Sequence, residues 1–320
     1  MPNIALLTTA MYASALVLLS VGFTFTHIME KFPNFAHISY STIGTLIAYS
    51  LVRIVGVNPY IAIPIAAVMS GFIGMALYLL MVRPMKQAGT SSVHITFAMF
   101  ALTYVVDTFL LIYSFWVMLN FRLRPASTGW LLRRFDTKIF GLPGITVVSP
   151  IMSVILVFAI HLFLTRNKFG IATRAVSEDP RLASSLGVNT FQIYLISWFI
   201  TGALAGLAGA SLSLWQPTYI ERTDTLMVNV LAASILGGLD SIYGAIIGGI
   251  IIAFTQRLMP GMLIRAVGIW IAEYITLTPI ILIVCVQLLI PRGIAGAFSK
   301  YQTLIRKLKA GVGRLIRSSS

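Results

Sequence analysis

A succession of apolar segments, each long enough to cross a lipid bilayer, constrains this chain more than any other feature. A transmembrane helix needs roughly 20 predominantly apolar residues. The clearest such segments, in chain order, are residues 4–28, 61–82, 94–119, 147–164, 191–215 and 267–290. Hydrophobic residues make up 58% of the 320 residues and charged residues only 10%, which excludes a water-soluble domain. The sequence therefore predicts an all-α, polytopic transmembrane helical bundle with about eight membrane segments.

The net charge of +14 is typical of nucleic-acid-binding proteins as well as of membrane proteins. Here the cations lie at the ends of apolar segments and in residues 299–320, where anionic lipid and the positive-inside rule account for them. We therefore expect the lipid bilayer, and no nucleic acid, as a partner. Residues 4–28 lack a basic start and exceed the length of a signal-peptide core, so we expect them to be retained as a span.

Nothing in the sequence indicates an enzyme. The pattern G-x-x-x-x-G-K-[ST], which would cradle nucleotide phosphates, does not occur, and the four histidines stand apart from any nucleophile or acid at a motif distance. The single cysteine, Cys285, lies in an apolar segment, which excludes a disulfide framework and a cysteine-based metal site. We expect no catalytic residues, no metal and no cofactor bound by this chain.

A polar stretch at residues 165–189 interrupts two apolar segments and has internal structure. Asp179 precedes Pro180, which disfavours helix at Asp179 and suits the first turn of a new helix. We expect Asp179 to cap this second short helix, which carries Leu182 and Leu186 and ends near Gly187. In the first helix, Ile171, Ala175 and Val176 are predicted to share one face, with Arg174, Glu178 and Asp179 away from it. Such a bent pair of amphipathic helices predicts a docking surface; the alternative is a loop that lies on the bilayer.

Two segments, near 34–44 and 229–244, are unusually polar or glycine-rich for membrane spans. The first is predicted to be half irregular and half helix, ending near Arg53; the second is broken in its middle by glycines. Paired interrupted segments indicate a central pathway in transporters built from repeats. We predict that polar side chains of both segments hydrogen-bond a passing zwitterion, or alternatively cap broken helix ends: Asn34, His37, Ser39, Ser41, Ser234, Asp240 and Ser241.

Three further features set expectations for packing and topology. Gly202 and Gly206 form a small-residue seam that lets helices approach closely. Positive-inside counting favours the cytosol for residues 83–86, where Pro84 is predicted to end a helix, for the 165–189 loop and for the tail. Alternating spans then leave the basic connector 121–144 outside, and the tail returns inside only if 226–258 forms two short helices. Residues 299–320 fit either an interfacial amphipathic helix or a disordered basic tail.

The motifs in these stretches resemble the permease subunits of ABC importers, in particular the branched-chain amino acid type. The resemblance covers most of residues 34–296, with Asn34-Phe35-Ala36-His37 matched but Ile38 in place of a glycine, and Asp240 likewise where a glycine is usual. It is most specific in 165–249, where the matched positions are Thr165, Arg166, Gly170, Ala172, Arg174, Ala175, Glu178, Asp179, Ala183, Leu186, Gly187, Val188, Asn189, Gly237, Gly238, Ser241, Gly244, Gly248 and Gly249.

The resemblance implies a multi-pass subunit of a prokaryotic plasma (inner) membrane, with residues 1–298 as the permease domain and 165–189 as its cytosolic coupling loop. It implies a second permease subunit in a homo- or heterodimer, two cytosolic ABC ATPases and an extracytoplasmic substrate-binding protein as partners. ATP would be bound by the ATPases, and branched-chain amino acids or related small polar solutes would be the cargo. The residues that it assigns to ATPase coupling are Gly170, Arg174, Ala175, Glu178, Asp179, Leu186 and Gly187.

Two other interpretations remain open from the residues. Asp107 lies near the middle of a predicted span, where a carboxylate costs roughly 2.5–3.5 kcal/mol and is by default functional or paired. An ion-coupled secondary transporter or channel would use Asp107 as its ion site; otherwise we expect it to bond a neighbouring helix. A structural membrane scaffold is the third interpretation, for which the interrupted segments would serve no purpose.

Overall fold

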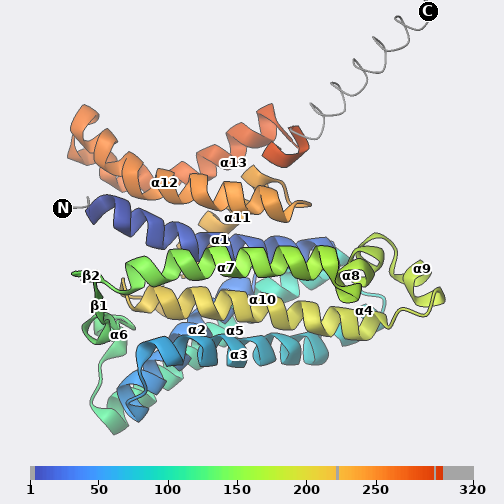
Figure 1. Ribbon diagram of the computed structural model, residues 1–320, viewed down its shortest axis with the longest axis horizontal. Helices are drawn as coiled ribbons and strands as arrows, with labels where there is room; N and C mark the ends of the chain where they lie inside the picture. The colour runs from blue at the N-terminus through green and yellow to red at the C-terminus, as the bar shows by residue number, and fades with distance from the viewer. Residues whose placement is uncertain (1–3, 221–222, 292, 298–320) are drawn as a thin grey trace, which may run out of the picture.

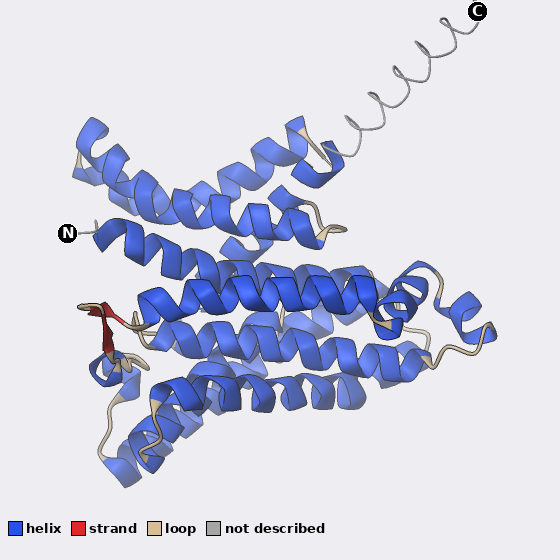
Figure 2. Cartoon of the chain, viewed as in Figure 1, coloured by secondary structure: helices blue, strands red, loops and turns tan. Residues whose placement is uncertain are grey.

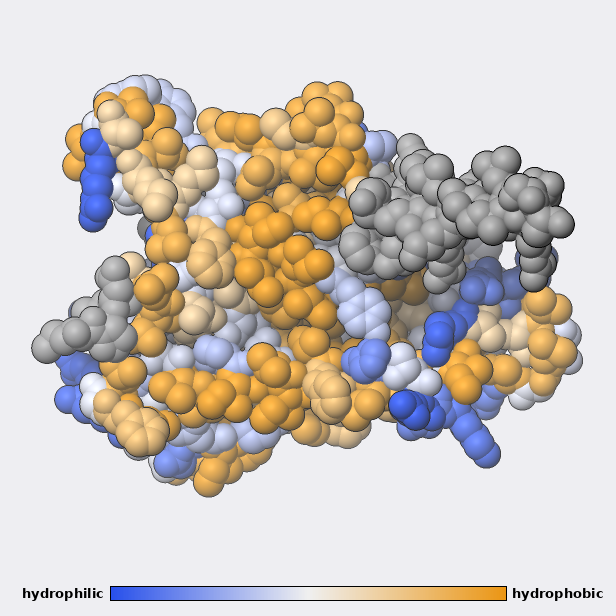
Figure 3. Space-filling view, turned by 45° about the horizontal axis from the view of Figure 1, so that its top comes forward, coloured by the Kyte–Doolittle hydropathy of each residue, from blue (hydrophilic) through white to orange (hydrophobic). Residues whose placement is uncertain are grey.

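The computed structural model describes residues 4–220, 223–291 and 293–297. Within these ranges, eight helical segments are long and apolar enough to span a membrane, and Thr225–Gly237 forms a shorter apolar helix. This confirms the polytopic helical bundle. In Figure 3 hydrophobic side chains form a band across the middle of the visible face, and hydrophilic ones gather at its two ends. The predicted tail at 299–320 lies outside the described residues.

The elements follow one another along the chain with few long connections (Figures 1 and 2). They are α1 (Ile4–Glu30), α2 (His37–Ser50) with a π turn η1 (Leu51–Val55), α3 (Pro59–Leu77) with a π turn η2 (Tyr78–Val82), α4 (Arg83–Gln87), α5 (Ser92–Phe121), α6 (Pro125–Thr128), η3 (Arg133–Phe135), β1 (Lys138–Ile139), β2 (Leu142–Pro143), α7 (Ile145–Arg166), α8 (Lys168–Glu178), α9 (Pro180–Ser185), α10 (Thr190–Ser213), α11 (Thr223–Gly237), α12 (Ile242–Val267), the 3₁₀ segment η5 (Ile269–Leu277) and α13 (Thr278–Leu289).

The helices α1 and α10 form the centre of the bundle, and both are largely buried. The helix α10 packs against α2 and α3 through the predicted glycine seam. A Cβ on Gly202 would lie 2.6 Å from the Ser70 carbonyl oxygen, and a Cβ on Gly206 would overlap the Ser70 side chain. The seam prediction is therefore confirmed: the absent side chains let α10 and α3 approach backbone to backbone.

The first interrupted segment enters the bundle as predicted, but it becomes helical earlier. After α1 ends at Glu30, residues 31–36 run irregularly back into the interior, where the His37 ring lies 2.9 Å from the Leu19 carbonyl oxygen. Helix α2 begins at His37, so the prediction of irregular backbone through the serines was wrong. A hydroxyl-rich stretch is compatible with helix, and Thr42 donates to the Ile38 carbonyl of its own helix. Ile38 is buried in the core, so this position accommodates a large side chain.

Pro84 does not end its helix, which corrects the predicted proline stop. The helical segment runs on from Pro59 to Gln87. The π turn η2 immediately precedes α4 and places Pro84 in the first turn of α4. A proline is tolerated there because its missing N–H is not required for hydrogen bonding.

The helices α11 and α12 pack against each other as a hairpin, joined by residues 238–241. A Cβ on Gly237 would overlap the backbone of Gly244, and a Cβ on Gly248 would overlap the Ala233 carbonyl. The segment therefore returns to the side from which it entered, as the topology requires. Only the first helix is short, however: α12 continues through Pro260 to Val267, which corrects the expected pair of short helices.

The basic connector between α5 and α7 is a folded cap, made of α6, η3 and the antiparallel pair β1–β2. Trp130 is 1% exposed and stacks edge-on against Tyr49 at 4.9 Å. Asp136 accepts a hydrogen bond of 2.5 Å from the Tyr60 hydroxyl, and the Arg133 guanidinium lies over the Trp215 ring at 4.8 Å. The cation–π contact thus stabilises Arg133, one of the positive charges of the basic connector.

The molecule has two ends, which Figure 1 shows at opposite sides of the bundle. We call the end with α4, α8 and α9 the loop end, and the end with α6, β1 and β2 the cap end. Residues 293–297, after α13, lie at the loop end. This arrangement agrees with the predicted topology, in which the 83–86 turn, the 165–189 loop and the chain's exit share one side.

Candidate coupling loop and translocation pathway

The 165–189 loop folds into the two short helices predicted from its sequence. The Asn167 side chain accepts a hydrogen bond from Phe169 N and caps α8. The Asp179 carboxylate accepts hydrogen bonds of 2.9 and 3.0 Å from the backbone N–H groups of Arg181 and Leu182, so it caps α9 as expected. Gly187, with φ of +84°, ends this helix in the left-handed conformation.

The buried face of α8 differs from the prediction. Gly170, Thr173 and Val176 face the bundle, whereas Ile171 and Ala175 are exposed. The apolar pattern alone could not distinguish a face packed on the bundle from one left for a partner. Arg174, Glu178 and Asp179 are exposed, as predicted.

A small apolar core fixes the loop to the rest of the bundle. Val176 of α8 and Ala183 of α9 pack with Phe25 and Met29 from the end of α1 and with Ile193 from the start of α10. Because these side chains belong to the two central helices, α8 and α9 pack directly against the centre of the bundle. Three large apolar side chains of the loop are exposed among its polar ones: Ile171 is 61% exposed, Leu182 59% and Leu186 75%.

A buried charged cluster stands beside this core at the loop end. The Glu30 side chain at the end of α1 is completely buried and forms an ion pair with Lys86 of α4. Its Oε1 atom also accepts a 2.7 Å hydrogen bond from Trp198 Nε1 of α10. The Lys86 ammonium lies 4.1 Å from the centre of the Tyr194 ring. We call Glu30, Lys86, Tyr194 and Trp198 the loop-end clasp, because together they join α1, α4 and α10.

The predicted pathway residues of the first half are all buried at the start of α2. Asn34, His37 and Ser39 have no exposed surface, and Ser41 is 3% exposed. Nδ1 of His37 and Oγ of Ser39 have no hydrogen-bond partner among the described residues. Unpaired polar atoms in an interior are costly unless water or a solute reaches them. Both atoms therefore retain hydrogen-bonding capacity for water or a solute.

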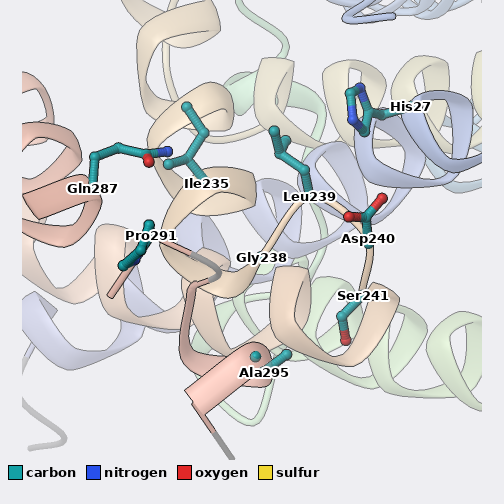
Figure 4. Close-up of a pocket in the computed structure, with 10 residues that line it drawn as sticks. His27, Ile235, Gly238, Leu239, Asp240, Ser241, Gln287, Pro291 and Ala295 are labelled. Atoms are coloured by element: carbon teal, nitrogen blue, oxygen red, sulfur yellow. The ribbon is translucent and has the colours of Figure 1, made fainter. Parts of the chain in front are cut away.

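Of the three pathway residues predicted in the second half, only Ser234 is buried in the interior. Ser234 is buried and lies 3.4 Å from the Ser20 carbonyl oxygen, next to the Leu19 carbonyl that His37 contacts. Asp240 is exposed and Ser241 is half-buried; both lie in the turn between α11 and α12, at the cavity drawn in Figure 4. Ser241 accepts a hydrogen bond from Gly244 N and caps α12, so it serves the structural role weighed against the pathway role.

A second cavity, of about 620 Å³, lies among α1, α2, α11, α12 and the end of α10. Hydroxyl groups of α2 line it at Ser41, Thr42 and Thr45. On its opposite walls the Arg257 guanidinium lies over the Tyr12 ring at 4.3 Å and donates a hydrogen bond to Gln216. The cavity thus presents a cation and several neutral hydrogen-bonding groups to a small polar solute.

Sequence reasoning missed this second set of polar residues. Asn229 Nδ2 donates a 2.9 Å hydrogen bond to the Tyr12 hydroxyl, so Asn229, Tyr12, Arg257 and Gln216 form one network across α1, α11, α12 and the turn after α10. The available signal was the occurrence of Gln216, Asn229 and Arg257 within otherwise apolar stretches. Their separation along the chain concealed that they meet in space.

The fold and these sites define a multi-pass membrane protein with a polar interior and a structured loop at one end. A family model described as "branched-chain amino acid transport system / permease component" matches residues 5–286. The chain therefore belongs to this permease family, as the motif resemblance predicted. It is a transport component of the plasma membrane rather than an enzyme.

Individual relatives agree with this assignment. The chain is 34% identical over 285 residues to a probable branched-chain amino acid transport permease protein LivH of Methanocaldococcus jannaschii, covering 89% of this chain and 90% of that protein. It is 27% identical over 168 residues to the high-affinity branched-chain amino acid permease LivH of Escherichia coli K12, covering 52% of each chain. It is also 28% identical over 134 residues to an autoinducer 2 import system permease of Photorhabdus laumondii, covering 40% of each. No solved structure matches the chain.

Proposed function

We propose that this chain is the permease subunit of an ATP-driven ABC importer that moves branched-chain amino acids, or related small polar solutes, across the plasma membrane. The observation that carries the proposal is the 165–189 loop, which is packed on α1 and α10 at its base and exposes apolar side chains at its tip. A loop that only connected two spans would need no such rigid base. A loop that transmits force from a motor protein requires both features.

We propose that the loop end faces the cytosol and receives two ATPase subunits, one for each permease of a homo- or heterodimer. The last described residues, 293–297, lie at this end. The cations of residues 299–320 follow them in the sequence, in agreement with the positive-inside rule. Ile171, Leu182 and Leu186 would then enter an apolar groove of the ATPase, and Arg174, Glu178 and Asp179 would lie around them. The coupling residues Gly170, Ala175 and Gly187 would set the shape of this surface.

The proposed pathway leads from the 620 Å³ cavity towards the buried group at the start of α2. Ser41 links the two, because it lines the cavity and belongs to the same helix as His37 and Ser39. Neutral hydroxyl, amide and imidazole groups would bind a zwitterion weakly, so they would not retain it. An extracytoplasmic binding protein would deliver the solute at the cap end and supply most of the specificity. Asp240, which is exposed at the loop end, would stand near the exit.

The experiment is to coexpress the permease with ABC ATPases encoded in the same genome and to purify the complex. Leu182→Asp and Leu186→Asp place a charge in the proposed apolar contact and should abolish copurification of the ATPase. Phe140→Asp is the matched control, because Phe140 is 96% exposed but lies in the cap between β1 and β2. Retention of the ATPase by the Leu182 and Leu186 variants would refute the proposed coupling surface.

Transport itself is tested with proteoliposomes that contain the purified complex and its binding protein. ATP is enclosed in the vesicles, where it reaches complexes whose cytosolic side points inward. It should drive uptake of labelled leucine, isoleucine or valine. Uptake driven by a proton or sodium gradient without ATP would instead support the ion-coupled interpretation. Competition with unlabelled amino acids, amides and urea then defines the solute class.

A further inference from the structure

A third cavity, of about 510 Å³, lies at the loop end between α7 and α12. Both helices pack on α1, and a 2.5 Å hydrogen bond between His161 Nδ1 and the Tyr243 hydroxyl joins them. The cavity extends from this bond to the base of α8. We call it the α7–α12 crevice. It shares no lining residue with the 620 Å³ cavity, and its one residue in common with the proposed exit of the solute is Asp240, beside Ser241 in the turn before α12.

The walls of the crevice are divided into an apolar part and a charged part. Aliphatic and aromatic side chains from α1, α7 and α12 form the apolar part: Phe25, Ile28, Val157, Ile160, Leu164 and Ile246. The charged part is at the end nearest α8, where Lys31 and Arg174 meet the hydroxyls of Thr173 and Ser177. A single carboxylate, Asp240, also lines the crevice. Two cations and one acid leave the lining with an excess of positive charge.

Contacts at the ends of α1 and α7 hold the two cationic residues in place. Lys31 adopts a left-handed conformation, with φ of +58°, in the turn that ends α1. Its backbone N–H donates to the His27 carbonyl. Arg174 Nη2 donates a 2.9 Å hydrogen bond to the Leu164 carbonyl at the end of α7. Lys31 is therefore held in the turn after α1, and Arg174, from the middle of α8, is held against the end of α7.

We propose that the α7–α12 crevice binds a membrane phospholipid, with its phosphodiester between Lys31 and Arg174 and an acyl chain along the apolar wall. Basic pockets between transmembrane helices at the cytosolic side are suited to phospholipid headgroups. The outer faces of α7 and α12 continue the apolar wall, with Val154, Phe158 and Ile250 exposed. A free phosphate would leave this wall without a partner. Asp240 is placed to accept the ammonium of an ethanolamine headgroup.

The bound lipid would connect the loop to the bilayer. Arg174, Thr173 and Ser177 belong to α8, whereas Lys31 follows α1 and the apolar wall belongs largely to α7 and α12. A phospholipid in the crevice would thus stabilise the docked position of α8. This inference rests on the proposed cytosolic orientation of the loop end but not on ATPase binding, so lipid retention by the isolated chain tests it separately.

The test is native mass spectrometry of the delipidated full-length chain in detergent. Four probes separate the contributions: phosphatidylglycerol and phosphatidylethanolamine carry both phosphate and chains, diacylglycerol carries chains alone, and glycerol 3-phosphate carries phosphate alone. We expect each chain to retain one molecule of phospholipid and to retain neither diacylglycerol nor glycerol 3-phosphate. Stronger retention of phosphatidylethanolamine would identify Asp240 as a headgroup contact; equal retention of diacylglycerol or glycerol 3-phosphate would overturn the site.

Variants locate the binding in the crevice. Lys31→Gln should weaken phospholipid retention about fivefold, the effect of one basic residue near a lipid surface. Lys168→Gln, an exposed lysine of α8 that does not line the crevice, is the matched control and should bind as the wild type does. Ile160→Trp fills the apolar wall and should also reduce retention, with thermal unfolding as the check that it folds. Equal losses in the two lysine variants would show surface attraction only and refute the crevice.

Discussion

The loop-end clasp yields an asymmetry that can be measured. Glu30 has no exposed side-chain surface, whereas the side chain of its partner Lys86 is 30% exposed. Removal of one member of a buried ion pair leaves the other charge uncompensated, which costs about 3–5 kcal/mol when that charge is fully buried. Lys86→Met leaves the buried Glu30 carboxylate without its cation and should lower the free energy of unfolding by this full amount. Glu30→Gln leaves Lys86 without its carboxylate, but the Lys86 ammonium reaches water. We therefore expect the free energy of unfolding to fall by only about 1–2 kcal/mol.

The double variant Glu30→Gln/Lys86→Met should be more stable than Lys86→Met alone, because it leaves no buried charge without a partner. The assay is reversible unfolding of the detergent-solubilised chain by a denaturing surfactant, followed through tryptophan fluorescence. Trp198→Phe is the control for the third member, since it keeps a ring but removes the hydrogen bond to Glu30. Equal destabilisation by the two single variants, or a larger loss for Glu30→Gln, would refute the reasoning from burial.

Three further predictions follow from other parts of the molecule. Asp179→Ala removes the cap of α9 and should cost about 1 kcal/mol, seen as faster hydrogen exchange at Arg181 and Leu182, whereas Asp179→Asn should retain protection. Gly206→Ala forces a Cβ into Ser70 and should destabilise the chain by about 1–3 kcal/mol, while Gly261→Ala, which meets no atom within 4 Å, should not destabilise it; equal melting temperatures would contradict the close packing. Asp107→Asn should leave ATP-driven uptake largely intact, and its loss would favour the ion-coupled alternative.

Local sequence signals predicted several elements because their causes are local. Asp179 followed by Pro180 defines a helix start whatever surrounds it, and the structure places the cap there. The glycine spacing of 202 and 206 indicates a face without side chains, which any packed neighbour must approach closely. The length of each apolar segment is a property of the chain alone, and it determined the class of membrane protein.

Other features depended on which segments meet in space. The apolar pattern of α8 contained two possible faces, and only the packing of Val176 on Phe25 and Met29 showed which one is buried. Polar side chains at the start of α2 predicted irregular backbone, but the segment is helical where it packs against α10 and α3.

The amino-acid sequence by itself determined that this chain lies in a membrane, roughly how many spans it has and how the 165–189 loop is bent, because hydrophobic length and helix capping act within a few turns. Only the tertiary structure decided that Tyr12, Gln216, Asn229 and Arg257 form one network and that Glu30 is sealed between Lys86 and Trp198. These contacts join residues far apart in the chain. Their partners are selected by how helices pack, which no local pattern specifies.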